Sequence, residues 1–111
     1  TGRPAALLDG DELTARRTAA VSALAASLLV PAGASRMLLC GAGRVGRLLP
    51  FAMRSALPGL AQVEVWSPGG ASAEALAREL DASGFRTSAV RDLEAASRRA
   101  DVLSCATLAR E

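Results

Sequence analysis

The 111-residue chain contains no His, Lys or Tyr, and these absences exclude several kinds of catalytic site. Without His, the chain by itself can form neither a Ser-His-Asp triad, nor a Cys-His pair, nor a His-ligated metal site, so we expect no metal centre. Without Lys or Tyr, a Schiff-base lysine and a Tyr/Lys proton relay are excluded as well. The chain therefore lacks a full set of the usual acid–base residues.

Aromatic side chains are almost as scarce, since only Phe51, Trp66 and Phe85 occur. The charge is nearly balanced, with 13 Arg against 11 Asp and Glu and a net charge of +2, and no three basic residues stand in a row. Nucleic-acid binders normally gather their cations on one stripe and interleave aromatics for base stacking. We therefore expect no nucleic-acid partner.

Long apolar runs are missing too, because Arg or Asp interrupts every stretch before it reaches the roughly 20 residues that a membrane helix needs. We expect no membrane partner. No signal peptide opens the sequence and Thr1 is not an initiator, so we interpret the chain as a cytoplasmic fragment of something longer. Cys40 and Cys105 both lie in apolar runs, which favours buried free thiols over a disulfide.

A long helical pattern dominates the first third of the chain. The short apolar run Ala5–Leu8 stops at a turn beginning with Asp9, and the pattern then extends from about Thr14 to Leu29, with Thr14 preferred over Asp9 as its cap. Pro31 to Gly33 ends the helix and forms a hinge-like link. We expect an apolar stripe on this helix to face the core. Its members are Leu13, Val21, Leu24 and Leu28.

Strand and helix patterns alternate through the rest of the chain. The strands are expected at 37–40, 63–66, 86–90 and 102–105, and the helices at 44–56, 72–81 and 92–99. The order β-α-β-α-β-α-β with short links predicts an α/β fold with a parallel sheet and right-handed crossovers. We therefore predict the first half of a Rossmann-type doubly wound sheet, preceded by a long entry helix.

The segment from Gly41 to Gly46 has the pattern G-x-G-x-x-G and joins a buried strand directly to a helix. In such a loop Gly41 allows the tight turn, Gly43 lets a pyrophosphate approach the backbone, and Gly46 permits close helix–strand packing. The helix N-terminus adds free N–H groups and a partial positive charge. The pattern predicts a dinucleotide site, and its alternative is a packing turn that binds nothing.

The end of the next strand, about twenty residues on, bears on the choice of dinucleotide. NAD-selective sites place a carboxylate there, but this chain has Trp66 and Ser67, and Glu64 stands two residues too early. Ser67 and the amides of residues 69–71 could hold a 2′-phosphate, with added charge from Arg44. This favours NADP(H). The alternative is that Ser67 only caps the turn and either dinucleotide fits.

Two residues outside the loop are further candidates. Arg17 lies in the middle of the apolar stripe, between Leu13 and Val21, where a guanidinium needs an anionic partner. A bound carboxylate would serve, and so would a structural ion pair or a side chain that reaches water. Thr107 follows the last strand at the edge where ligands bind, and either contacts a cofactor or caps the next loop.

Four segments of the chain together resemble the ornithine cyclodeaminase/mu-crystallin family. They are residues 5–10, 13–23, 41–46 and 100–107, in the family's order and across nearly the whole chain. The specific part is the helix start Leu-Thr-Ala-x-Arg-Thr-Ala-Ala at 13–20, because Gly-Ala-Gly loops occur in many Rossmann domains. Two departures stand out: Ser67 replaces the usual acidic residue, and Val45-Gly46 replaces the usual Gln-Ala.

The resemblance implies an NAD(P)-dependent oxidoreductase or ammonia-lyase, with hydride transfer at the α-carbon of a small amino or imino acid. It implies that residues 1–32 are a strand end and connecting helix from a substrate and dimerisation domain. Residues 33–111 would then be the NAD(P)-binding domain, incomplete at its C-terminal side. Homodimerisation would use the domain outside this chain.

The resemblance also assigns roles to three residues. Arg17 matches the Arg that binds the substrate carboxylate in the family, while Arg44 and Val45 match residues that contact the cofactor diphosphate. The family's catalytic Lys and Asp lie before and after this segment, so the fragment alone is expected to be inactive. The alternative is a non-catalytic NAD(P)H-binding module, either a sensor or a crystallin-like binding protein.

Overall fold

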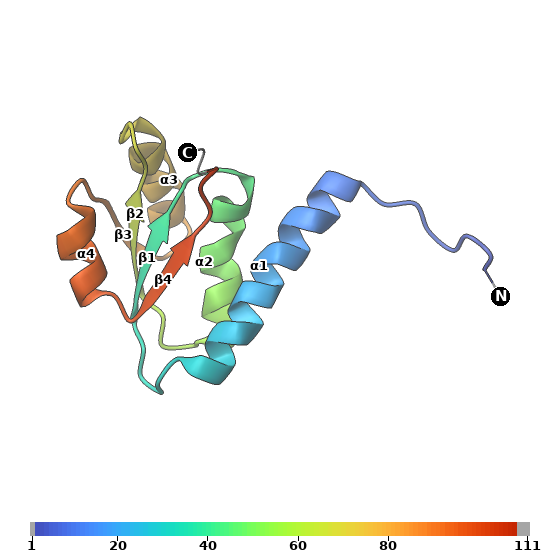
Figure 1. Cartoon of the computed structure of the whole chain (residues 1–111), viewed down its shortest axis with the longest axis horizontal. Helices are drawn as coiled ribbons and strands as arrows, with labels where there is room; N and C mark the ends of the chain where they lie inside the picture. The colour runs from blue at the N-terminus through green and yellow to red at the C-terminus, as the bar shows by residue number, and fades with distance from the viewer. Residues whose placement is uncertain (1, 109–111) are drawn as a thin grey trace.

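Four strands pair in parallel in the order β3-β2-β1-β4 in the computed structural model, which describes residues 2–108 (Figure 1). The strands are β1 (Arg36–Cys40), β2 (Gln62–Trp66), β3 (Arg86–Ala89) and β4 (Val102–Cys105). The helices are α1 (Gly10–Leu29), α2 (Arg44–Ala56), α3 (Ala71–Ala82) and α4 (Leu93–Arg99). This alternation confirms the predicted Rossmann-type sheet with its long entry helix.

The register of the strands brings their carboxyl ends to one edge of the sheet. Cys40, the last residue of β1, lies opposite Trp66 on β2 and opposite Cys105 on β4. Side chains alternate between the two faces of each strand, so Leu39 points to one side and Leu38 to the other. The segments that follow β1, β2 and β4 therefore emerge side by side.

The two faces of the sheet are covered unequally. Helices α1, α2 and α3 pack on one face around a large core that includes Met37, Leu39, Val63 and Leu76. Helix α4 covers the other face, where Leu38, Cys40 and Ala96 form a small cluster. Both clusters flank β1 and β2, so these strands are buried on both sides, as continuous apolar runs require.

Helix α1 begins earlier than predicted and buries a different face. Its cap is Asp9, whose carboxylate accepts the Glu12 N–H at 3.0 Å, so the preference for Thr14 is wrong. The expected apolar stripe is also on the wrong side, because Leu13, Val21, Leu24 and Leu28 are 42–78% exposed. The buried face consists of small side chains, which let the helix lie close against α2. They are Ala15, Ala19, Ala23 and Ala26.

The segment before α1 forms no strand within the described residues. Ala5–Leu8, expected as a strand end, is exposed and unpaired, and it extends away from the sheet in Figure 1. Helix α1 itself packs directly against α2. A domain division at residues 32 and 33 stays a prediction.

Asp101 ties the beginning of β4 to the beginning of β1. Its carboxylate accepts the N–H groups of Ser35 at 2.9 Å and Arg36 at 3.0 Å, while its own N–H donates to the Arg36 carbonyl. These backbone hydrogen bonds hold the pKa of the Asp101 carboxyl below its usual value. The Ala-Asp-Val segment at 100–102 thus has a structural role at the end of the sheet opposite the glycine loop.

We predict that Asp101→Asn lowers the Tm of the protein at neutral pH, because the charged carboxylate is the better acceptor for two N–H groups. A lowered folded-state pKa stabilises the fold above the ordinary carboxyl pKa of about 3.9, and this contribution is lost as pH falls through the folded value. Thermal melts from pH 7 downward should therefore show the two curves converging in acid. A Tm difference that does not depend on pH would contradict this role for the charge.

Candidate functional site

The glycine loop, residues 41–46, is held in place by backbone contacts at the carboxyl edge. Gly41 has φ +107°, and a Cβ on it would collide with the carbonyl oxygen of Ala106. A Cβ on Gly46 would collide with the Gly41 carbonyl. The Gly41 N–H donates to the Trp66 carbonyl at 2.8 Å, and the Ala106 N–H donates to the Cys40 carbonyl at 2.7 Å. These contacts fix the loop between β2 and β4.

Gly43 differs from Gly41 and Gly46, because a side chain at Gly43 would extend into open space. It is exposed and stands at the N-cap of α2, and a Cβ built on it meets nothing within 4 Å. No side chain of the described residues caps this end of α2. The first N–H groups of the helix, beginning at Arg44 and Val45, therefore face open space with the positive end of the helix dipole behind them. The arrangement fits a dinucleotide diphosphate.

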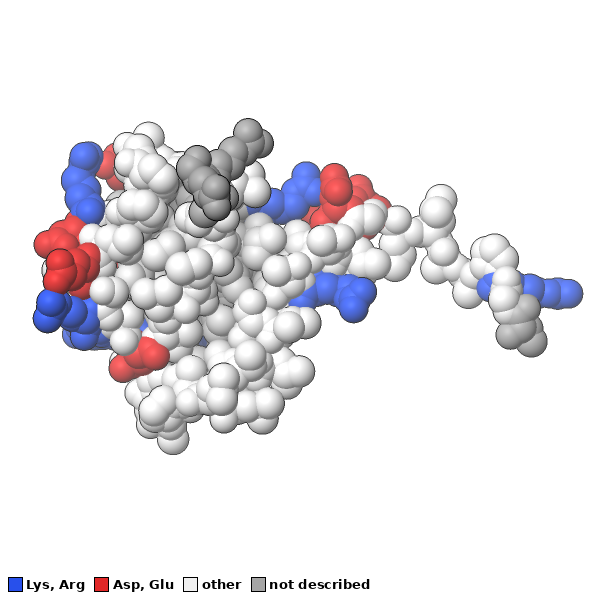
Figure 2. All heavy atoms as spheres, in the orientation of Figure 1, with Lys and Arg blue, Asp and Glu red and all other residues white. Residues whose placement is uncertain are grey.

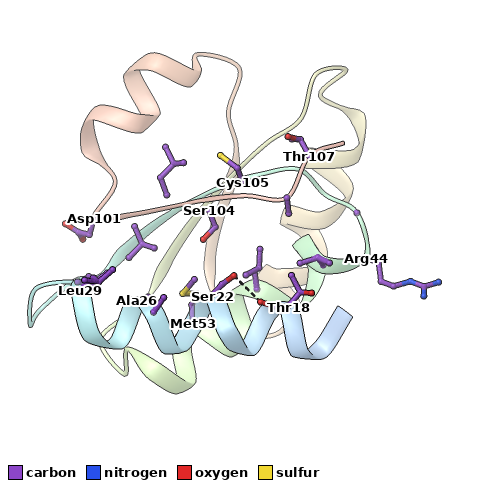
Figure 3. A pocket seen from close by; sticks show the side chains of 18 of the residues that line it. Thr18, Ser22, Ala26, Leu29, Arg44, Met53, Asp101, Ser104, Cys105 and Thr107 are labelled. Atoms are coloured by element: carbon purple, nitrogen blue, oxygen red, sulfur yellow. Dashed lines mark hydrogen bonds between the residues drawn. The ribbon is translucent and has the colours of Figure 1, made fainter. Parts of the chain in front are cut away.

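A groove of about 720 Å³ begins at this loop and passes between α1, α2 and β4 (Figure 3). Gly43, Arg44 and Val45 line it together with Ala106 and Thr107 from the end of β4. The fold thus brings Thr107 to the same groove as the loop, and its contact with a cofactor stays a prediction. Gly41 and Gly46 are buried behind it, where they shape the backbone.

The Arg44 side chain does not point into the groove. Figure 3 shows it directed away, and its guanidinium lies 3.4 Å from the Asp11 carboxylate at the start of α1. Both side chains are largely exposed, so this ion pair contributes little to stability. What Arg44 offers the groove in this structure is its backbone.

Ser67 and Trp66 lie at the end of β2, beyond the glycine loop. The Ser67 side chain is almost completely buried, and its Oγ accepts the Ala73 N–H at 3.1 Å. Its carbonyl accepts the Gly70 N–H, also at 3.1 Å. Ser67 therefore does cap the first turn of α3, which was the alternative to a ligand role, although its O–H remains able to donate.

Glu64 is occupied elsewhere, as its position within the strand indicated. It is 7% exposed, and both of its carboxylate oxygens accept hydrogen bonds from Arg99 of α4 at 2.7–3.0 Å. This ion pair raises the pKa of the Arg99 guanidinium. Glu64 lies beneath α4 and does not replace the carboxylate that is missing at the strand end.

The structure adds one cation that the sequence analysis missed. The Arg91 guanidinium, from the loop after β3, approaches within 3.7 Å of the position where a Cβ on Gly70 would lie. Arg91 also lies 3.6 Å from the Glu74 carboxylate, and its side chain is 85% exposed. The pairing of β2 with β3 brings it to the Ser67 loop. The available signal was that Arg91 follows a predicted strand at the same sheet edge.

Arg17 lies on the outer side of α1 and not on a face turned toward the core. It is exposed and lines a shallow depression of about 400 Å³ with Leu13, Thr18 and Val21. No ion pair within residues 2–108 engages it, so the structural ion pair considered above does not form there. Its guanidinium stays accessible beside an apolar strip.

None of the helices within residues 2–108 is long and apolar enough to cross a bilayer. The same part of the chain holds no group of three or more potential metal ligands. Figure 2 shows Arg side chains next to Asp and Glu side chains around the margin of a largely uncharged face.

Comparison with known proteins gives consistent matches over the whole chain. A Δ(1)-pyrroline-2-carboxylate reductase of Paracoccus denitrificans is 40% identical over 99% of the chain, which covers 35% of that protein. The structure of Thermococcus litoralis Δ(1)-pyrroline-2-carboxylate reductase with NADH and L-proline superposes with a TM-score of 0.86 at 26% identity, covering 95% of this chain and 32% of that one. The structure of a lysine cyclodeaminase superposes with a TM-score of 0.87 at 34% identity, covering 99% of this chain and 31% of that one.

The chain thus spans about a third of the length of the relatives it matches. All of its residues, 1–111, match the sequence pattern of one family. The chain belongs to the ornithine cyclodeaminase/mu-crystallin family.

Proposed function

We propose that this chain is the cofactor-binding part of an NAD(P)-dependent oxidoreductase that acts at the α-carbon of a small amino or imino acid. The observation that carries the proposal is the uncapped N-terminus of α2 at Gly43, which opens at the sheet edge between β1 and β4. Dinucleotides bind at that position in doubly wound sheets, where the strand order reverses. Relatives named as reductases, one of them solved with NADH, support it.

In this proposal, different residues contact different parts of the cofactor. The N–H groups of Arg44 and Val45 hold the diphosphate, Gly43 gives it room, and Thr107 contacts the cofactor from the end of β4. Trp66 lies beside the adenine ribose at the end of β2. Hydride exchange at the substrate α-carbon is the chemistry that a bound nicotinamide supplies.

Arg17 binds the α-carboxylate of the substrate in this proposal. Its guanidinium is exposed and lacks an ion-pair partner among residues 2–108, and it stands beside the apolar side chains of Leu13 and Val21. Arg binds carboxylates with two parallel hydrogen bonds. One relative is named for a pyrroline carboxylate, one is solved with L-proline, and one is named for lysine. Each of these compounds carries a carboxylate. Ring reduction and cyclodeamination both begin from such a compound.

For the dinucleotide we propose a preference for NADP(H). No carboxylate stands at the end of β2 to repel a 2′-phosphate, since Glu64 is bound to Arg99. The Ser67 hydroxyl can donate, and the Arg91 guanidinium at Gly70 supplies a positive charge at the same loop. Arg91 also neutralises Glu74, the one acidic residue in the first turn of α3.

The glycine loop is tested with Gly43→Ala. A Cβ at Gly43 meets no protein atom within 4 Å, so we expect the free energy of unfolding to change by less than about 1 kcal/mol, while the Kd for NADPH rises by about tenfold or more. Gly10→Ala, which is equally unobstructed and lies at the start of α1, is the matched control and should leave the Kd unchanged. Equal NADPH affinity in Gly43→Ala and the wild type would contradict a diphosphate site here.

The cofactor preference is tested by following quenching of Trp66 emission, with Trp66→Phe to identify the signal. We expect NADPH to bind about tenfold more tightly than NADH, a difference of about 1.4 kcal/mol. Arg91→Gln should reduce that ratio, whereas Arg78→Gln, an exposed position on α3, should not. Equal binding or tighter NADH binding would overturn the NADP(H) preference. No binding of either would leave the glycine loop as a packing turn.

The carboxylate role is tested in the whole enzyme with Arg17→Gln. Loss of a charged hydrogen-bonding partner should raise the KM for the carboxylate substrate by about 10- to 100-fold, with NADPH affinity unchanged. Arg16→Gln removes a neighbouring guanidinium that pairs with Glu12 at 2.6 Å, and it should alter neither quantity. An unchanged KM in Arg17→Gln would exclude the role. A whole protein that binds NADPH but turns over no amino or imino acid would instead favour the non-catalytic binding module.

A further inference from the structure

Cys40 and Cys105 end neighbouring strands at the same register position. Adjacent strands lie about 4.8 Å apart, which is within the roughly 4.4–6.8 Å between Cα atoms that a disulfide spans. Register partners also point to the same face of the sheet. Both thiols are free, and the register of β1 and β4 places them opposite each other.

The two thiols differ in how easily a reagent reaches them. Cys40 is buried against Leu38 and Ala96 beneath α4, and burial together with the neighbouring Cys105 raises the pKa of its thiol to about 11. Cys105 is exposed, which corrects the expectation that both thiols are buried. In Figure 3 the side chains of Cys105 and Ser104 point to opposite sides of β4. Cys105 is therefore the thiol that meets a solute first.

We propose that Cys40 and Cys105 form an oxidisable dithiol that closes to an intramolecular disulfide when the protein meets a hydroperoxide. The Cys105 sulfur attacks one peroxide oxygen, the O–O bond breaks, and the leaving hydroxide takes up a proton as water, which leaves a sulfenic acid. The Cys40 sulfur then attacks the Cys105 sulfur, the S–O bond breaks, and a second water leaves. Two thiols and one hydrogen peroxide thus give one disulfide and two waters, and a dithiol reductant reverses the step.

The cysteine pair lies directly beside the glycine loop. Gly41 and Ala106 immediately follow the two cysteines, and a Cβ on Gly41 would collide with the Ala106 carbonyl. The proposal itself depends only on the β1–β4 register and on the exposure of Cys105. Evidence against the cofactor assignment would therefore not bear on the disulfide, and evidence against the disulfide would not bear on the cofactor.

The test is peptide mapping of the intact protein after brief treatment with one equivalent of hydrogen peroxide, alkylation of the remaining thiols, and cleavage after Arg. The cysteines then reside in two peptides, Met37–Arg44 and Ala100–Arg110. We expect these peptides to be joined, with a mass equal to their sum less two hydrogens, and to separate after reduction. Alkylated Cys40 beside Cys105 oxidised to a sulfinic acid, or both cysteines recovered alkylated, would overturn the proposal.

Three variants test whether the disulfide depends on the register between β1 and β4. Cys40→Ser should stop at the sulfenic acid of Cys105, which dimedone traps, and Cys105→Ser should leave Cys40 unoxidised unless urea is present. In Cys105→Ser combined with Ser104→Cys, the thiol moves one residue along β4 to the opposite face, and no link to Cys40 should form. A link in that double variant as strong as in the wild type would show that pairing does not depend on the register, and would overturn the proposal.

Discussion

The carboxyl edge of the sheet depends on how closely three stretches of backbone approach one another at Gly41. The Ala106 carbonyl occupies the space where a Gly41 side chain would be, and the Gly41 carbonyl does the same for Gly46. Neither contact tolerates a Cβ. Because Gly41 and Ala106 also hydrogen-bond to Trp66 and Cys40, the ends of β1, β2 and β4 are joined at one point. The open N-terminus of α2 is positioned by this junction.

Several polar side chains around the site are already engaged within the protein. Arg99 binds Glu64, the Ala73 N–H binds Ser67, and Asp11 binds Arg44. What remains for an anionic ligand is largely backbone: the first N–H groups of α2 and α3, whose N-caps are both glycines. A backbone site of this kind recognises phosphate groups by geometry, and leaves selectivity to a few side chains at its margins such as Arg91.

The sequence predicts the order of elements well because β1 and β2 are buried on both faces and the turns between elements contain Gly and Pro. It also predicts the glycine loop, where Gly41 and Gly46 each have a steric reason to lack a side chain and Gly43 has open space around it. The buried face of α1 was predicted wrongly, since periodicity gives more weight to Leu24 and Leu28 than to the alanines that fit against α2. Arg91 was missed because its approach to Gly70 depends on strand pairing, which is not local in sequence.

The alanine face of α1 has a mechanical consequence. Alanine has no side-chain torsion, so α1 contributes no rotamers to its seam with α2, and only α2 side chains such as Leu49 and Met53 can change conformation there. The two helices lie against each other on one face of the sheet (Figure 1). Any repacking of this seam therefore comes from the α2 side. Because α2 begins at the glycine loop, the helix that can repack is also the one that presents the loop.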